Sequence, residues 1–190
     1  VRDAKSAVRW VRQNQQRLGV DPKRVLVSGG SAGGHIAACT AVLEKFDEET
    51  EDRNVASRPN ALALFNPALV LAPIRGEQPL DEKRSANLEN RLGVAPVELS
   101  PYHHVRRGLP PTIIFHGQAD TVVPFKTAQQ YKDKARQLGN RCQLVGYPGQ
   151  SHGFFNQSRG AKGRYHETVQ SLDAFLVSLG YLATQLNSSQ

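Results

Sequence analysis

The sequence predicts an α/β fold with a doubly wound, mostly parallel sheet. Short apolar runs at residues 25–28, 61–65, 111–117 and 142–147 have the length and composition of buried strands. Helical patterns or long connections separate these runs. That alternation is typical of βαβ units, because parallel strands need a crossover between them. The first run also ends in a glycine-rich turn with a serine at its centre, and an alanine-rich helical pattern follows at once.

Four segments have the spacing of helices. Apolar residues recur in them every three or four positions, which places these residues on one helix face. The segments cover residues 3–18, 32–43, 124–138 and 165–179. In the first, Trp10 lies beside an apolar stripe that ends at Leu18. Gly19 and Gly139 are natural ends for the first and third helices, and Pro124 favours a helix start.

A long polar segment, about residues 74–109, separates the second and third strand patterns. It contains a charged helical pattern at residues 81–91 and the run Ser100-Pro101-Tyr102-His103-His104. Long connections inside compact domains usually form lids or covers. We therefore expect this cover segment (residues 74–109) to lie over a functional site.

The composition predicts one globular domain over residues 1–190, long enough to bury a real core. The longest apolar stretch, residues 61–74, is interrupted by prolines, so no membrane span is expected. A net charge of +7 permits attraction to anionic polymers. However, the Lys and Arg residues are scattered along predicted helix faces without interleaved aromatic residues. We interpret them as solvated charge and predict no nucleic-acid partner.

Nothing in the acidic or cysteine residues indicates a metal or a cofactor, and we predict none. The acidic residues between positions 47 and 52 fit no ligand loop, so we expect a solvated connection there. Cys39 and Cys142 lie in apolar patterns and are expected to be small buried core residues.

The chain contains no Met and begins at Val1, inside a helical pattern. We therefore expect it to be a piece of a longer or processed protein. A leader peptide cannot be sought in such a piece, so bacterial cytoplasm and secretion both stay open as its compartment.

The glycine-rich turn has the sequence G-x-S-x-G, as Gly29-Gly30-Ser31-Ala32-Gly33. In a strand–turn–helix context this pattern predicts a nucleophile elbow, in which the serine occupies a strained turn between strand and helix. We expect the outer two glycines to leave room for that turn. The start of the following helix presents free N–H groups, notably that of Ala32, to a developing oxyanion. A glycine-rich turn without chemistry is the alternative interpretation.

Three predicted strands deliver a chemically useful residue at their carboxyl ends, namely Ser31, Asp120 and His152. A serine hydroxyl is a poor nucleophile unless a neighbouring imidazole removes its proton. A carboxylate in turn fixes the imidazole tautomer and stabilises the imidazolium that forms. Singly, Asp120 resembles a turn residue and His152 a surface histidine. Their joint placement favours a Ser–His–Asp triad.

The other histidines have simpler interpretations. His35 lies one turn into the elbow helix and is expected to pack or cap locally. His116 lies at a strand end and is expected to shape the floor of the site. His103 and His104 belong to the cover segment. None of these histidines has metal-ligand spacing with a supporting acid.

The quoted motifs resemble those of the α/β-hydrolases, in which the triad also follows the order Ser, Asp, His. The chain is similar to the C-terminal two-thirds of hormone-sensitive-lipase-like and acetylxylan/feruloyl-esterase-like carboxylesterases. The matching motifs are Gly29–His35, the segment 111–124 and the run 151–154, and the likeness covers nearly the whole chain. It implies cofactor-free hydrolysis of short-acyl esters through an acyl-enzyme, with acetyl and feruloyl esters of carbohydrate as candidate substrates. The implied roles are Ser31 as nucleophile, His152 as base and then acid, Asp120 as orienting acid and Ala32 as one oxyanion donor.

One departure from the family is plain. Its members carry more strands before the segment that opens here, and an HGGG-type loop among them supplies further oxyanion N–H groups. No residues upstream of Ser31 match that loop. We therefore expect an α/β-hydrolase fold that lacks its first strands. The strand before Ser31 would then be an unpaired edge, through which the chain could form a homo-oligomer.

Two other functions stay open. A serine peptidase resembling the prolyl-oligopeptidase group shares the elbow and the triad order, but those enzymes usually place a large aromatic residue beside the nucleophile, where Ala32 stands here. A hydrolase-derived fragment that binds ligands without catalysis is the other alternative. The presence of all three triad residues argues against it, and the missing strands argue for it.

Overall fold

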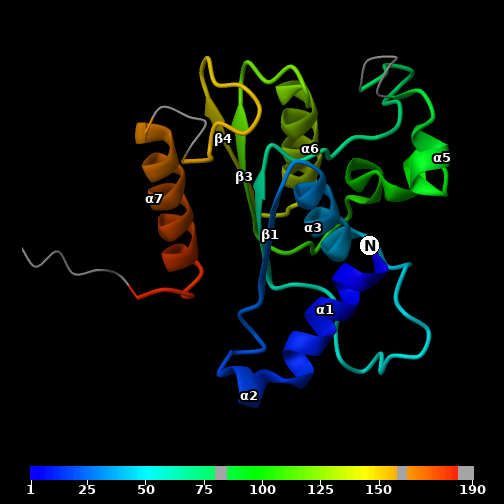
Figure 1. Cartoon of the computed structure of the whole chain (residues 1–190), viewed down its shortest axis with the longest axis vertical. Coiled ribbons are helices and arrows are strands. Elements are labelled where there is room, and N and C mark those ends of the chain that lie inside the picture. Colours follow the sequence, from blue (N-terminus) through cyan, green and yellow to red (C-terminus); the bar gives the residue numbers. More distant parts are fainter. Residues whose placement is uncertain (80–84, 158–161, 184–190) are drawn as a thin grey trace, which may run out of the picture. The chain divides into compact units, whose positions relative to one another are not determined.

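The computed structural model describes residues 1–79, 85–157 and 162–183, and Figure 1 shows the chain as a ribbon. Two compact units divide it, Val1–Gly153 and Phe154–Gln190. The first contains all four strands of the described residues and every residue predicted to form the site. The second contains the helix α7 (Lys162–Ser178). Among the described residues, no helix is both long and apolar enough to cross a membrane.

The described part of the first unit forms a parallel sheet in the order β1-β2-β3-β4. Its strands are β1 (Leu26–Gly30), β2 (Ala61–Phe65), β3 (Thr112–Gly117) and β4 (Cys142–Tyr147). The register pairs Leu26 with Ala61, Leu62 with Thr112, and Thr112 with Cys142. This sheet confirms the predicted strands and their parallel arrangement. All carboxyl ends consequently meet at one edge.

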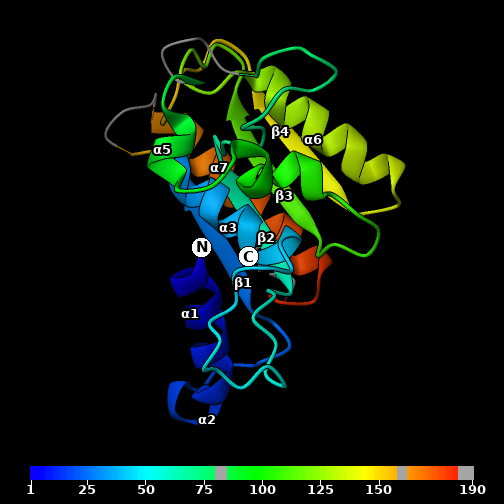
Figure 2. The same ribbon diagram turned by 90° about the vertical axis from the view of Figure 1, so that its right-hand side faces the viewer.

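Two crossover helices cover the sheet from the same side, as the two views in Figures 1 and 2 agree. They are α3 (Ala32–Val42), which follows β1, and α6 (Phe125–Gln137), which precedes β4. Because the strand order never reverses, right-handed crossovers place both helices on one face. The helix α3 carries small buried side chains, including Ala37, Ala38 and Cys39. These small residues let the helix lie close to the sheet and complete the core.

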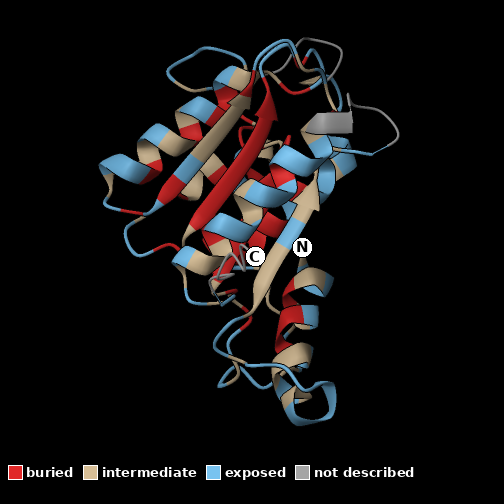
Figure 3. Ribbon diagram, turned by 90° about the vertical axis from the view of Figure 1, so that its left-hand side faces the viewer, coloured by how far each residue is buried: buried red, intermediate tan, exposed pale blue. Residues whose placement is uncertain are grey.

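Burial falls from the centre of this sheet to its first strand. Every residue of β3 is buried, as expected of a central parallel strand. In contrast, the residues of β1 are half-buried or exposed. Figure 3 shows this contrast by colour. In the described part of the chain, β1 pairs with β2 alone and forms one edge of the sheet.

The first predicted helix is interrupted, which corrects the expectation of one helix over residues 3–18. The chain instead forms α1 (Arg2–Gln13) and the short α2 (Gln15–Leu18). Asn14 lies between them, and its Nδ2 donates to the carbonyl of Trp10 at 2.9 Å. An asparagine side chain that binds a backbone carbonyl competes with the regular helix. Trp10 and Leu18 are both exposed, so the apolar stripe does not reach α2.

The interpretation of all the basic and acidic residues as solvated is wrong for one cluster. Lys5 and Arg9 of α1 are buried, with 2% and 3% of their surface exposed. Asp47 accepts hydrogen bonds from both, from Lys5 Nζ at 2.6 Å and from a terminal nitrogen of Arg9 at 2.8 Å. Arg9 also pairs with Glu51. These ion pairs therefore hold the acidic connection, residues 47–52, against α1, because a buried cation needs a partner of opposite charge.

The cover segment contains α5 (Leu88–Leu92) and the 3₁₀ helices η1 (Pro96–Leu99) and η2 (Pro101–His104). Within the predicted helix at residues 81–91, the structure has helix at Ser85 and again from Leu88 onward, and residues 81–84 lie outside the described residues. Cys39 and Cys142 are buried free thiols, as predicted. Burial raises the pKa of each thiol to about 12.

Candidate active site

Ser31 lies between the last residue of β1 and the first residue of α3. Its φ of 54° and ψ of −119° form a strained conformation for a residue with a side chain. Two hydrogen bonds hold the turn. The N–H of Ser31 donates to Phe65 O at 2.8 Å, and the N–H of His35 donates to Ser31 O at 3.0 Å. The first of these fixes the serine to the neighbouring strand.

The glycines around Ser31 differ in their roles. A Cβ on Gly29 would lie 2.5 Å from the carbonyl carbon and oxygen of Gly33, which is impossible without a backbone shift. A Cβ on Gly33 would meet nothing within 4 Å. The expectation that both outer glycines leave room for the turn is therefore correct for Gly29 and wrong for Gly33. The next residue, Gly34, is the one that needs to be a glycine, because a Cβ there would lie 2.9 Å from the side chain of Pro67.

His152 lies in the loop after β4 and links the serine to an acid. Its Nε2 lies 2.9 Å from Ser31 Oγ, and its Nδ1 lies 2.7 Å from Asp120 Oδ2. The structure therefore brings together the three residues predicted from the sequence. Gly117 at the end of β3 permits this approach, because a Cβ there would lie 2.3 Å from the carbonyl oxygen of Gln150. The loop that carries His152 can thus lie against the end of β3.

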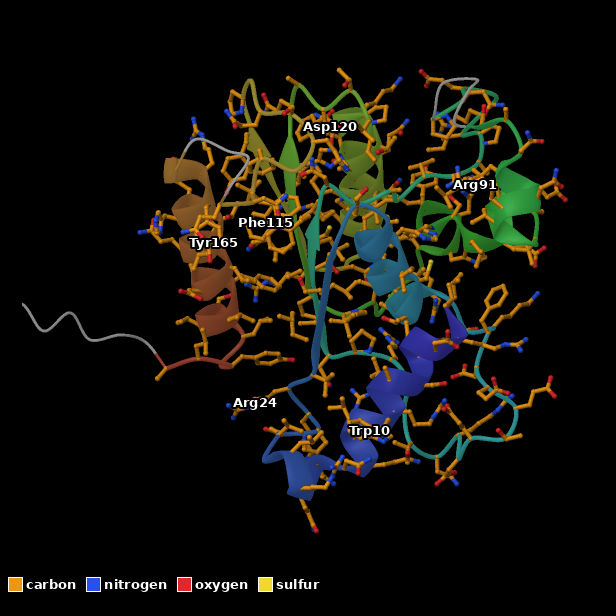
Figure 4. The ribbon with its side chains drawn as sticks, viewed as in Figure 1. Trp10, Arg24, Arg91, Phe115, Asp120 and Tyr165 are labelled. Carbon is orange, nitrogen blue, oxygen red and sulfur yellow. The ribbon has the colours of Figure 1, made fainter. Side chains whose placement is uncertain are left out.

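Asp120 lies in the loop between β3 and α6, where Figure 4 labels it. It is 7% exposed. Its Oδ1 accepts the backbone N–H groups of Val122 at 2.8 Å and Val123 at 2.9 Å. Burial raises the pKa of this carboxyl, but the hydrogen bonds from His152 and from the N–H groups of Val123 and Val122 outweigh burial and lower it. The group is therefore held as a carboxylate facing the imidazole.

Since Asp120 Oδ2 can only accept, His152 Nδ1 carries the proton between them. The other nitrogen, Nε2, then has a free lone pair that faces the hydroxyl of Ser31. This tautomer can take the proton of Ser31 as the hydroxyl attacks a carbonyl carbon. The N–H of Ala32 is the first of α3 and has no acceptor within the helix, so it is available to an oxyanion near Ser31.

Asn66 is a polar contact of the triad that the sequence did not reveal. It lies directly after β2, and its Nδ2 donates to Asp120 Oδ2 at 2.7 Å. The asparagine is fully buried. One signal was present in the sequence, because a polar residue at the carboxyl end of a buried strand lies at the same sheet edge as Ser31 and Asp120.

Four other histidines, all in the first unit, contact backbone groups. His116 is fully buried and donates from Nε2 to Val123 O at 2.9 Å, while burial lowers its pKa. His35 is buried and packs locally, as expected, with its Nε2 3.3 Å from Cys39 Sγ of the same helix, and the same nitrogen also reaches Leu99 O at 2.7 Å, in the cover segment. His103 contacts the carbonyl oxygen of Pro73, directly before the cover segment, and His104 contacts that of Val97, within it. Across the described residues, no group of three or more His, Cys, Asp and Glu is arranged to hold a metal ion.

A parallel sheet with a serine elbow, an acid and a histidine at its carboxyl edge is the architecture of the α/β-hydrolase fold. The chain belongs to the BD-FAE family, which matches residues 1–135. Residues 98–179 also match the dienelactone hydrolase family.

Individual relatives agree with this assignment. The probable carboxylic ester hydrolase LipM of Mycobacterium tuberculosis is 28% identical over 73% of this chain and 34% of its own length. The acetylxylan esterase of Xylanibacter ruminicola is 29% identical over 94% of this chain and 35% of its own. Among solved structures, esterase 2 of Thermogutta terrifontis phosphonylated by sarin is 47% identical, with a TM-score of 0.91 over 96% of this chain and 66% of that one. The predicted resemblance to α/β-hydrolase esterases is confirmed. The chain spans about a third of the length of these two curated relatives.

Proposed function

We propose that this chain carries the catalytic residues of a serine carboxylesterase that hydrolyses short-acyl esters. The hydrogen-bonded line from Ser31 Oγ through His152 to Asp120 carries this proposal. The likeness to carboxylic ester hydrolases supports it independently. In this proposal residues 1–190 belong to one catalytic domain, with residues 74–109 as its cover segment.

The geometry supports the following steps for the proposed reaction. Ser31 Oγ attacks the ester carbonyl carbon while His152 Nε2 takes the hydroxyl proton, and the carbonyl oxygen becomes an oxyanion that accepts the N–H of Ala32. The C–O bond to the alcohol then breaks, and His152 gives its proton to the leaving alcohol. Water attacks the acyl-enzyme by the same route and releases the acid. Asp120 keeps its charge throughout and stabilises the imidazolium.

Short acyl groups are proposed from the relatives. Esterase 2 of Thermogutta terrifontis is also known in a butyrate-bound form, and the Xylanibacter ruminicola relative is an acetylxylan esterase. These names favour acyl chains of a few carbons. They also favour acetylated carbohydrate as one substrate class for this chain.

Reaction with a fluorophosphonate, followed by intact-mass measurement, tests whether Ser31 is activated. We expect one adduct on the unmodified chain and on Ser28→Ala, a control that removes another serine from β1. We expect none on Ser31→Ala. Absence of an adduct on folded chain would contradict the proposal and favour a non-catalytic fragment.

A panel of nitrophenyl esters from acetate to octanoate then tests the acyl group, beside a prolyl-peptide substrate. We expect hydrolysis to be fastest with the shortest esters. Cleavage of the peptide alone would overturn the esterase assignment in favour of a peptidase.

A further inference from the structure

Asn66 links the nucleophile strand to the acid strand. Its N–H donates to Phe115 O of β3 at 2.8 Å, and the carbonyl of the preceding residue, Phe65, accepts the N–H of Ser31. The φ of Asn66 is 44°, in the left-handed region that asparagine tolerates better than most residues. The backbone at this position therefore holds both neighbouring strands, and its side chain is turned into the buried space beside Asp120.

The amide of Asn66 and the imidazole of His152 donate to the same oxygen. Asn66 Nδ2 and His152 Nδ1 each lie 2.7 Å from Asp120 Oδ2. The two nitrogens are 3.4 Å apart, and since both carry hydrogen they lie side by side as donors. The amide must present its nitrogen here, because its oxygen would repel the carboxylate.

The carbonyl oxygen of the Asn66 amide is the unfavourable part of this arrangement. Among the described residues, Asn66 Oδ1 has no hydrogen-bond partner. An unpaired buried acceptor is unfavourable, and an apolar side chain would avoid it. We infer that Asn66 is a positioning residue of the proposed esterase site, whose amide fixes Asp120 Oδ2 where His152 Nδ1 donates. This inference rests on the proposed function.

The Asn66 amide differs from His152, the other donor to Asp120 Oδ2, because the amide does not change its charge. In the proposed reaction His152 alternates between neutral and charged forms, so its hydrogen bond to Oδ2 changes at each step. Asn66 keeps the same charge throughout and holds the oxygen still. The backbone N–H groups of Val122 and Val123 do the same for Oδ1. Each carboxylate oxygen thus has at least one donor that does not titrate.

The described titratable groups that face Asp120 are His152 and His116. His116 Nε2 lies 3.4 Å from Asp120 Oδ2, but its proton is directed to Val123 O at 2.9 Å. On the other side of His152, the facing group is the hydroxyl of Ser31. Among the described residues, no carboxylate other than Asp120 is within ion-pairing distance of His152. A carboxyl introduced at position 66 would therefore be the new titrating group beside Asp120.

The variant Asn66→Asp tests the inference with a side chain of the same shape. Its carboxyl can donate to Asp120 only while it holds a proton, so the ratio of its kcat to that of the unmodified chain should fall by about tenfold or more as the pH rises. Its KM should stay within about twofold, since Asn66 contacts Asp120 rather than substrate. The matched control is Asn140→Asp. Asn140 is also buried, and it binds Leu109 N and Arg106 O instead. Its kcat ratio should not depend on pH.

A second measurement needs no substrate. The downfield proton resonance of His152 Nδ1–H, assigned by its loss in His152→Ala, reports the hydrogen bond to Asp120 directly. We expect this resonance to shift with pH in Asn66→Asp and to broaden in Asn66→Gly, which keeps the left-handed backbone but removes the amide. It should be unchanged in Asn140→Asp.

The outcomes separate this inference from the proposed function. A resonance that changes in the Asn66 variants supports positioning even if no ester is hydrolysed, in which case the esterase proposal alone fails. An unchanged resonance in folded Asn66→Asp and Asn66→Gly overturns the positioning role. Unchanged kcat in both variants at every pH, with an active unmodified chain, overturns it as well.

Discussion

The N–H of Ser31 donates a 2.8 Å hydrogen bond to the carbonyl of Phe65, on the neighbouring strand. This bond holds a serine whose φ of 54° is unfavourable for any residue with a Cβ. The turn therefore stores strain, and the adjacent strand β2 maintains it. Backbone strain of this kind is typical of functional sites, where a side chain must face the site instead of packing in the core.

Ser31→Gly should consequently unfold less readily than Ser31→Ala. Both variants remove the hydroxyl, but only glycine adopts a positive φ without strain, while alanine keeps the Cβ. We expect Ser31→Gly to be more stable by about 1 kcal/mol, the strain relieved less the extra entropy of glycine in the unfolded chain. Urea unfolding of the two variants measures the difference. Equal midpoints would show that the turn is not strained.

The glycines two positions either side of Ser31 should respond in opposite ways to alanine. In Gly29→Ala the new Cβ would overlap the backbone of Gly33, so we expect a loss of about 1–3 kcal/mol or more. Gly33 lies inside α3 with open space at its Cβ position. There alanine favours the helix, so Gly33→Ala should be neutral or gain up to about 1 kcal/mol.

Denaturant unfolding of both alanine variants checks this pair. Because the change in side chain is identical, any difference reports the surroundings of the two positions. A Gly33→Ala variant as unstable as Gly29→Ala would contradict the structure of the elbow.

The positions of the strands could be predicted from the sequence, and so could the proximity of Ser31, Asp120 and His152. Both follow from one physical rule, that parallel strands place their carboxyl ends at the same edge of a sheet. Apolar runs reveal the strands, and the residues that follow each run then share that edge. The catalytic roles of the three residues stay a prediction.

The errors have physical causes of another kind. Lys5 and Arg9 have the spacing of a solvated helix face, and only the approach of Asp47 in three dimensions accounts for their burial. Asn66 donates to Asp120 because β2 lies between β1 and β3 and because its φ is positive. Neither strand order nor a single backbone angle is encoded in local composition. Such contacts depend on residues far apart in the chain.

The ion pairs of Asp47 should make the free energy of unfolding depend on pH in the acid range. Burial raises the pKa of this carboxyl, but hydrogen bonds from Lys5, Ser57 and Arg9 outweigh burial and lower it from 3.8 to about 2. Folding thus favours the ionised form. The stabilisation is complete above the unfolded pKa and is lost as the pH falls from about 4 to about 2. It amounts to about 2 kcal/mol, at 1.36 kcal/mol for each pKa unit.

Urea unfolding at several pH values measures this dependence. In Asp47→Asn, the free energy of unfolding should lack the contribution that the unmodified chain loses in acid. At neutral pH it should lose about 3–5 kcal/mol, because Lys5 and Arg9 stay buried without their shared carboxylate. Glu49→Gln is the control, since this exposed acid belongs to the same connection. If Asp47→Asn kept the acid dependence of the unmodified chain, Asp47 would not be its source.

The edge of the sheet at β1 should let this chain associate with a second copy. Beside β1 lies a hollow of about 680 Å³, lined mainly by apolar side chains of α1, β1 and α3. Val20 and Ile36 line it and are 39% and 40% exposed. An edge strand with apolar surroundings is a template for pairing with another chain. We therefore expect the 20.9 kDa chain to form at least a dimer at micromolar concentration.

Light scattering at several concentrations tests this association, with one variant in the hollow and one outside it. Ile36→Lys places a charge beside β1, where pairing would bury it without a partner, so it should shift the population toward monomer. Val97→Lys changes a similarly exposed residue of η1, which does not line the hollow, and should leave the mass unchanged. Because both variants add one positive charge, net repulsion between chains rises equally in the two. A loss of association in Ile36→Lys alone would therefore locate the contact at the β1 edge, whereas a monomeric unmodified chain at every concentration would contradict the prediction.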